Sequence, residues 1–229
     1  MKKYTYLLFD VDGTLMDFNR AEREAYIEAL HDFNVFENED NIVDVYSPIN
    51  QKWWKKLERK ETTKQETLLG RHRETFETLN MNLPVDEFND AYANHLSKKH
   101  YVMEGAIELL DDLRKQGYTV IAATNGVYTT QQRRLTEAEL INRFDGIYVS
   151  EKIGVDKPNL GFFEAIFNDY KEMNSSNTLM IGDSLTSDIK GGINAGLDTC
   201  WLNIKMVNDT DIKPTYEIHK LKELYTIIN

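Results

Sequence analysis

Short apolar runs recur along the chain, and each of them ends at a polar or acidic residue. The later runs are separated by stretches whose apolar residues follow the three-to-four-residue spacing of a helix. This alternation predicts an α/β fold in which helices cover a doubly wound parallel sheet. We expect five strands, in the runs 4–10, 118–125, 146–150, 178–183 and 199–203.

Helical spacing is clearest just before the second predicted strand, where the apolar side chains recur on one side of the segment 106–113. Gly117 then suits the end of that helix, since glycine is common just beyond a helix C-terminus. Two further helices are predicted at 161–170 and 187–195, and the second is followed by Gly196. These segments would connect consecutive parallel strands.

The segment from about residue 19 to residue 100 has a different pattern, because it lacks β-rich runs and is dense in charged and amide residues at helical spacings. We expect an all-helical insert of three or four helices, with Pro48 and Pro84 at helix boundaries. The predicted organisation is therefore a core formed by residues 1–17 and 101–229 and a helical insert formed by residues 18–100.

Composition and charge narrow the range of partners. The formal net charge of −11 argues against a nucleic-acid polymer, which is bound through clustered Lys and Arg, but a local cation could still bind a small phosphate ester. No apolar run reaches the roughly 18 residues of a membrane helix. Cys200 is the single cysteine, so an internal disulfide is excluded. We expect a cytoplasmic monomer or homodimer.

Candidate chemistry begins at the end of the first predicted strand. Asp10 and Asp12 are two residues apart, so in an extended chain both carboxylates lie on one face, and Gly13 allows the backbone to turn away. Ligands of open α/β sheets bind at the carboxyl ends of strands, which makes this pair a candidate site. The alternative is an ordinary Asp-Gly turn in which Asp12 bonds its own backbone.

Three other strand ends carry suitable groups. Thr124 and Asn125 could hold phosphate oxygens or cap a helix, and Lys157 before Pro158 could clamp a charge or be a solvated lysine. Asp183 follows the fourth strand, and Asp188 could be a ligand or only a helix-dipole partner. Carboxylates and a carbonyl are the ligands that Mg²⁺ prefers, so the set as a whole predicts magnesium-dependent phosphoryl chemistry.

In this order the residues resemble the four motifs of the haloacid dehalogenase-like superfamily, and the helical insert resembles that family's cap domain. The resemblance covers almost the whole chain and implies a Rossmann-like catalytic core. The motifs are Asp10-Val11-Asp12-Gly13-Thr14, Thr124-Asn125, Lys157-Pro158, and Gly182-Asp183 with Asp188.

The resemblance implies a role for each matching residue. Asp10 would form an aspartyl-phosphate, and Asp12 would protonate the leaving oxygen, activate water and offer its backbone carbonyl to the metal. Asp10 and Asp183 would bind Mg²⁺, with Asp188 supporting them. The transferring phosphoryl group would be held by Thr124, Asn125 and Lys157.

Segments 150–158 and 191–203 are further similar to bacterial pyrimidine nucleotidases, which implies a small phosphorylated metabolite, a nucleoside monophosphate, as substrate. Phe18, Asn50 and Trp54 would then face the base or sugar, although Phe18 and Trp54 could instead merely pack helices. Other small-metabolite phosphatases, a phosphoglucomutase-type phosphotransferase and a noncatalytic binding protein remain alternatives. Dehalogenation is disfavoured, because dehalogenases of this superfamily lack an aspartate at the second position, where this chain has Asp12.

Overall fold

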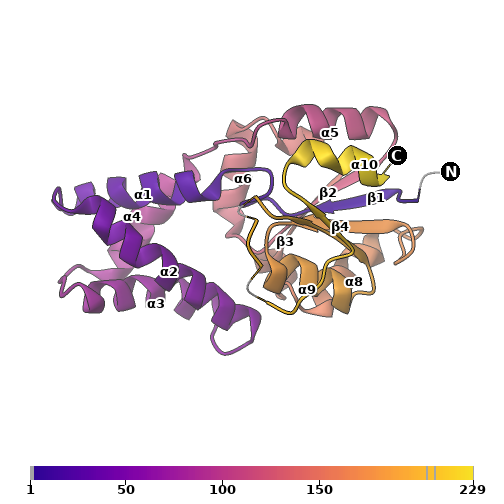
Figure 1. Ribbon diagram of the computed structural model, residues 1–229. Helices are drawn as coiled ribbons and strands as arrows, with labels where there is room; N and C mark the ends of the chain where they lie inside the picture. Colours follow the sequence, from indigo (N-terminus) through magenta and orange to yellow (C-terminus); the bar gives the residue numbers. More distant parts are fainter. Residues whose placement is uncertain (1–2, 205, 209, 229) are drawn as a thin grey trace. The chain divides into compact units, whose positions relative to one another are not determined.

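The computed structural model describes residues 3–204, 206–208 and 210–228. The chain forms two compact units: Met1–Asp17 with Tyr101–Asn229, which we call the core unit, and Phe18–His100, which we call the helical unit. Figure 1 shows the elements of both units. Among the described residues no helix is both long enough and apolar enough to cross a membrane.

The core unit is built on a sheet of six strands, in the order β3-β2-β1-β4-β5-β6, and every neighbouring pair is parallel. The predicted α/β fold with a doubly wound parallel sheet is thereby confirmed. The chain passes outward from β1 to β3, returns to the middle at β4 and continues to the other edge. The strands are β1 (Tyr6–Phe9), β2 (Thr119–Thr124), β3 (Gly146–Val149), β4 (Thr178–Gly182), β5 (Asp198–Leu202) and β6 (Tyr216–Ile218).

Both faces of the sheet are buried, which explains why its central strands are continuous apolar runs. In β1, Leu7 and Phe9 pack on one face with α5, whereas Tyr6 and Leu8 pack on the other with α8. Figure 1 accordingly shows α5 and α10 on one side of the sheet and α8 and α9 on the other. The helices of the core unit are α5 (Ala106–Lys115), α6 (Tyr128–Glu137), α7 (Ser150–Ile153), α8 (Leu160–Asp169), α9 (Lys190–Asn194) and α10 (Tyr225–Ile228).

Three short helical segments complete the core unit. The 3₁₀ turn η1 (Ile141–Arg143) precedes strand β3, the 3₁₀ turn η3 (Leu221–Leu224) precedes helix α10, and the π-helical turn η2 (Leu185–Ile189) leads directly into α9. The sequence predicted one regular helix over 187–195 in this region. A π turn places one extra residue in the turn, and such turns are frequent at functional sites.

The helical unit contains α1 (Phe18–Asp32), α2 (Glu39–Glu58), α3 (Lys64–Thr78) and α4 (Val85–Ser97), which fits the expected three or four helices. Pro84 lies at the N-terminal boundary of α4, as predicted. The prediction for Pro48 was wrong, because this residue lies inside α2. Its ring is exposed, while buried side chains on both sides of it, from Ile42 to Leu57, continue one apolar face, and that packing outweighs the local cost of proline.

Candidate active site

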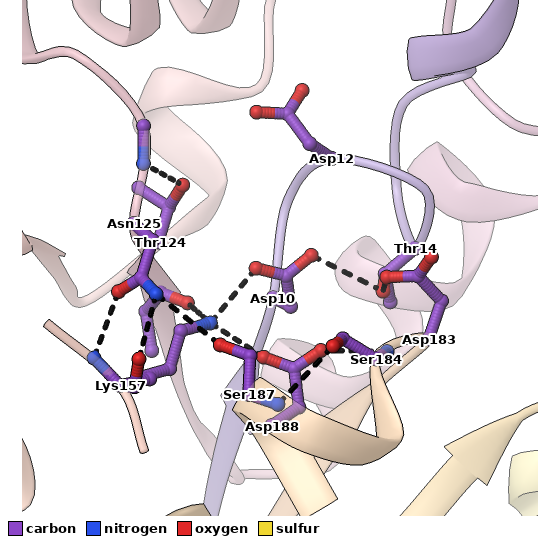
Figure 2. Close-up of polar contacts among 12 residues, drawn as sticks. Asp10, Asp12, Thr14, Thr124, Asn125, Lys157, Asp183, Ser184, Ser187 and Asp188 are labelled. Carbon is purple, nitrogen blue, oxygen red and sulfur yellow. Dashed lines mark hydrogen bonds and ion pairs between the residues drawn. The ribbon is translucent and has the colours of Figure 1, made fainter. Parts of the chain in front are cut away.

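The reversal of strand order lies between β1 and β4, and in open α/β sheets ligands bind outside the carboxyl ends of strands at such a point. Asp10 directly follows β1, Thr124 ends β2, and Asp183 directly follows β4. Because these three strands are adjacent, their polar ends meet at one edge of the sheet. Figure 2 shows the polar contacts that these residues make with their neighbours.

Lys157 is the central cation of this edge, and its side chain is only 1% exposed. Its Nζ lies 2.8 Å from Oδ1 of Asp10 and 2.6 Å from Oδ1 of Asp188, and it also donates to the carbonyl of Ala123. Burial alone would lower the pKa of Lys157, but the two carboxylates outweigh that effect and raise its pKa. Lys157 therefore remains charged inside the protein.

Asp10 is buried, and the loss of hydration is the main reason that its pKa rises to about 7. The charge of Lys157 opposes this rise, whereas the nearby carboxylates of Asp188 and Asp12 add to it. A carboxyl group with this pKa is only partly ionised near neutral pH, and additional positive charge would favour its ionised form. One lysine does not fully neutralise the site.

A cluster of three carboxylates shows where that additional charge would bind. Oxygen atoms of Asp10, Asp183 and Asp188 all lie within 4.8 Å of one another. A Cβ at Gly13 would overlap the Asp183 carboxylate, so the glycine, with φ of +87°, lets the loop after β1 approach it. Hard oxygen ligands at this spacing, with the Asp183 residue exposed to solvent, fit Mg²⁺, which keeps several waters.

The protein holds the Asp188 carboxylate closely, because both of its oxygens accept hydrogen bonds of 3.0 Å or less, whereas Oδ2 of Asp10 has a longer contact, 3.4 Å, with the Thr14 hydroxyl. Oδ1 of Asp188 accepts from Lys157, and Oδ2 accepts from the backbone N–H of Ser184 at 3.0 Å. Ser184 also accepts from the N–H of Ser187 at 3.1 Å and so caps the π turn that carries Asp188. This arrangement is consistent with the predicted supporting role for Asp188, and metal binding by Asp10 and Asp183 stays a prediction.

Asn125 connects two of the predicted motifs. Its side-chain oxygen accepts from the backbone N–H of Lys157 at 2.9 Å, and its amide nitrogen donates to the carbonyl of the same residue at 2.9 Å. The amide nitrogen also lies 3.2 Å from Oγ of Ser187. These contacts differ from the alternative N-cap role, since α6 begins after Val127 without a side-chain cap. Asn125 fixes the loop that carries Lys157.

The Asp12 carboxylate stands apart from the contacts that join Asp10 to Lys157 (Figure 2). Two side chains of α6 hold it: Nε2 of Gln131 donates to Oδ2 at 2.7 Å, and Nη1 of Arg134 donates to Oδ1. Neither residue is among the site residues predicted from the sequence. Their spacing of three residues would place them on one face of a helix, but the many other polar residues of this segment concealed that signal.

The three residues predicted to face a base or sugar all lie in the helical unit. Phe18 begins α1 and Trp54 lies in α2, and both are partly buried. Asn50 is only 2% exposed, and its amide joins the buried carboxylate of Glu22, at 2.6 Å, to the guanidinium of Arg71, at 3.0 Å. Contact with substrate stays a prediction for all three, and Asn50 has in addition a structural role.

The raised pKa of Asp10 predicts how the metal-free protein responds to pH. A carboxyl group that binds its proton more tightly when folded stabilises the fold below its ordinary pKa, near 4, and this contribution is lost as pH rises through about 7. We expect the free energy of unfolding to fall with pH across this window, by at most about 1.4 kcal/mol per pH unit from Asp10. Urea unfolding with a chelator present measures it.

Asp10→Asn is the matched control for this experiment, because it removes the titrating group and keeps the shape of the side chain. The difference between the two proteins reports the titration of Asp10 together with its effect on the pKa values of the neighbouring Asp183 and Lys157. A difference that stays constant with pH, or that changes in the opposite direction, would contradict the assignment.

Comparison with known proteins places this geometry in a family. Residues 4–196 match the model of the haloacid dehalogenase-like hydrolases. The HAD-hydrolase YfnB of Bacillus subtilis is 39% identical over 230 residues, covering 100% of this chain and 97% of its own. Its magnesium-bound crystal structure aligns with a TM-score of 0.93 over 100% of both chains.

Two further relatives cover nearly the whole chain. Pyrimidine 5′-nucleotidase PynA of Streptococcus pneumoniae is 37% identical over 96% of this chain and 93% of its own. Pyrimidine 5′-nucleotidase YjjG of Escherichia coli is 32% identical over 99% of this chain and 98% of its own. The chain therefore belongs to the haloacid dehalogenase-like hydrolase family and is a phosphatase-type enzyme of that family.

Proposed function

We propose that this protein is a Mg²⁺-dependent phosphomonoesterase that acts through an aspartyl-phosphate on Asp10 and prefers pyrimidine nucleoside 5′-monophosphates. The observation that carries the proposal is the Asp10 carboxylate held against the buried Lys157 cation, beside Asp183, at the reversal point of the sheet. A nucleophile, a fixed cation and oxygen ligands for a metal are the groups that phosphoryl transfer requires.

The reaction proceeds in two steps on the residues of this chain. An Asp10 carboxylate oxygen attacks phosphorus, the bond from phosphorus to the ester oxygen breaks, and Asp12 gives its proton to the departing alcohol. Asp12 then takes a proton from water, whose oxygen attacks the same phosphorus and releases inorganic phosphate and free Asp10. Asp12 ends each cycle protonated, as it began, and Asp10 ends it ionised.

Charge stabilisation accompanies both steps. Lys157 and the Thr124 hydroxyl hold the phosphoryl oxygens, and Asn125 contributes by fixing Lys157. Mg²⁺, bound by Asp10, Asp183 and the Asp12 carbonyl with support from Asp188, would supply further positive charge to those oxygens.

The nucleotide preference rests on the two pyrimidine 5′-nucleotidases that match nearly the whole chain. Phosphate release with Mg²⁺ from cytidine and uridine 5′-monophosphates, adenosine 5′-monophosphate, a hexose phosphate and p-nitrophenyl phosphate tests it. We expect kcat/KM for the pyrimidine nucleotides to exceed that for the hexose phosphate by about tenfold or more. An isomerised sugar phosphate would indicate a mutase, and no turnover of any ester would indicate a binding protein.

Trp54 is the aromatic side chain that we propose to contact the base. It is partly exposed on α2, and Nζ of Lys64 lies 4.8 Å from its ring centroid. Stacking of one base on an aromatic ring is worth about 1–3 kcal/mol, so Trp54→Ala is expected to raise KM for pyrimidine nucleotides by about tenfold and KM for p-nitrophenyl phosphate much less. Steady-state kinetics on both substrates measures the split.

Phe36→Ala is the control for Trp54→Ala, because it removes another aromatic ring of the helical unit, 61% exposed, that we assign no substrate contact. It should leave both KM values unchanged. Equal effects of Trp54→Ala on the two substrates would show that Trp54 only supports the fold.

A further inference from the structure

The side chains that hold Asp12 form a closed set on one face of α6. Gln131 and Arg134 are each 1% exposed and lie three residues apart, so they share a helix face. Nη1 of Arg134 donates to Oδ1 of Asp12 and also lies 3.2 Å from Oε1 of Gln131. Nε2 of Gln131 donates to Oδ2 of Asp12 at 2.7 Å. Each of the three side chains thus contacts the other two.

Gln131 also reaches the phosphate-binding threonine. Its Nε2 lies 2.9 Å from Oγ1 of Thr124, and the backbone N–H of Gly126 donates to the same oxygen at 3.1 Å. A hydroxyl oxygen has two acceptor positions and one hydrogen. Because both acceptor positions of Thr124 are filled, its hydrogen remains available to donate to a phosphoryl oxygen.

Gly126 makes room for this contact. A Cβ at this position would lie 2.7 Å from both Cγ and Nε2 of Gln131, closer than side chains tolerate. The glycine therefore lets the Gln131 amide sit between Asp12 and Thr124. The orientation of that amide is fixed, since its oxygen accepts from Arg134 and its nitrogen donates to Oδ2 of Asp12 and Oγ1 of Thr124.

The burial of the Arg134 charge indicates that its contact with Asp12 does more than stabilise the fold. The Asp12 side chain is 22% exposed, whereas that of Arg134 is 1% exposed. A partly solvated carboxylate does not need an arginine to neutralise it, and burying a guanidinium is costly. What the buried arginine adds is a fixed direction for the Asp12 carboxylate, because Nη1 of a guanidinium that is itself held in place by burial restricts its partner more than mobile water does.

We propose that Gln131 and Arg134 are positioning residues for hydrolysis, which orient Asp12 for proton transfer to the leaving oxygen and turn the Thr124 hydroxyl toward the phosphoryl group. This inference rests on the proposed function, in which Asp12 is the general acid and base. It makes α6 the element that aligns proton transfer with phosphate binding.

The test compares two leaving groups, because a poor leaving group must be protonated by the general acid as it departs and a good one need not be. A nucleoside monophosphate releases an alkoxide unless Asp12 protonates it, whereas p-nitrophenyl phosphate releases a stable phenolate. Arg134→Met is expected to lower kcat/KM for cytidine 5′-monophosphate by about 100-fold and for p-nitrophenyl phosphate by less than about tenfold. Arg134→Lys, which keeps the charge and one donor, should recover part of the loss.

Arg133→Met is the matched control, since Arg133 lies beside Arg134 on α6 but is exposed and pairs with Glu137 at 2.7 Å. It should leave both values unchanged. Gln131→Met adds a second readout: it should reproduce the leaving-group dependence and also weaken inhibition by inorganic phosphate. If Arg134→Met does not fold, as judged by circular dichroism, the leaving-group dependence is measured on Gln131→Met instead.

Asp12→Asn separates failure of this inference from failure of the proposed function. If Asp12→Asn shows the leaving-group dependence and the folded Arg134 and Gln131 variants do not, the positioning role is wrong and the mechanism stands. If Asp12→Asn lowers kcat/KM, which reports the step that releases the leaving group, equally for both substrates, Asp12 is not the general acid, and the inference fails with the mechanism. An equal loss on both substrates in the Arg134 variant alone would indicate a structural role.

Discussion

Replacing Asp10 with asparagine is expected to lower kcat by about four orders of magnitude or more, with Mg²⁺ and substrate saturating. The amide has the size and shape of the carboxylate but cannot attack phosphorus. It can still accept from Nζ of Lys157, which lies 2.8 Å from Oδ1 of Asp10, so the fold should be retained. Release of inorganic phosphate measures the loss.

Asp10→Asn should also abolish the covalent intermediate, which can be trapped by acid quenching during turnover of a phosphate-labelled substrate. Asp169→Asn is the matched control, because this exposed aspartate of the core unit contacts Tyr148 and lies outside the site. Full activity of Asp10→Asn would overturn the mechanism. If activity were lost but phosphate-labelled protein still formed, another residue would be the nucleophile.

Most of the core unit could be predicted because its central strands are buried on both faces. The sequence of such a strand is a nearly continuous run of apolar residues, and the runs at 4–10, 118–125 and 178–183 coincide with β1, β2 and β4. The edge strand β6, Tyr216–Ile218, was not predicted. It has three residues, one of them buried, and a pattern that short cannot be distinguished from a loop.

Local rules failed where tertiary packing opposed them. Proline ordinarily ends a helix, yet α2 continues through Pro48 because its buried face extends on both sides. The π turn at Leu185–Ile189 was invisible for a different reason: an extra residue in one turn leaves the composition of the segment unchanged. The energies that decide such details come from contacts between distant parts of the chain.

The candidate site was predictable to the extent that each residue follows a strand. The carboxyl ends of adjacent parallel strands meet, so Asp10, Thr124 and Asp183 could be placed together from the sequence. Gln131 and Arg134 could not, because they reach Asp12 from a helix, and which helix face turns to the site depends on packing. The engagement of Asn50 by Glu22 and Arg71 escaped prediction in the same way.

Removing the buried cation gives the second large effect. Lys157→Met is expected to lower kcat by about 10²–10³-fold, since the phosphoryl oxygens lose a fixed positive charge. In the metal-free protein it should also lower the free energy of unfolding by about 3–5 kcal/mol, because Asp10 and Asp188 lose the ammonium group that lies between them. Urea unfolding with a chelator measures the second effect.

The two effects of Lys157→Met should respond differently to Mg²⁺. Mg²⁺ at the proposed site of Asp10, Asp183 and Asp188 would replace the missing positive charge, so the stability of the variant should recover more than that of the native chain, whereas kcat should stay low. Lys171→Met, at an exposed position, is the control and should change neither quantity. If the variant were as stable as the native chain without metal, the carboxylates would not depend on Lys157. If Mg²⁺ restored kcat, Lys157 would serve only to hold the site together.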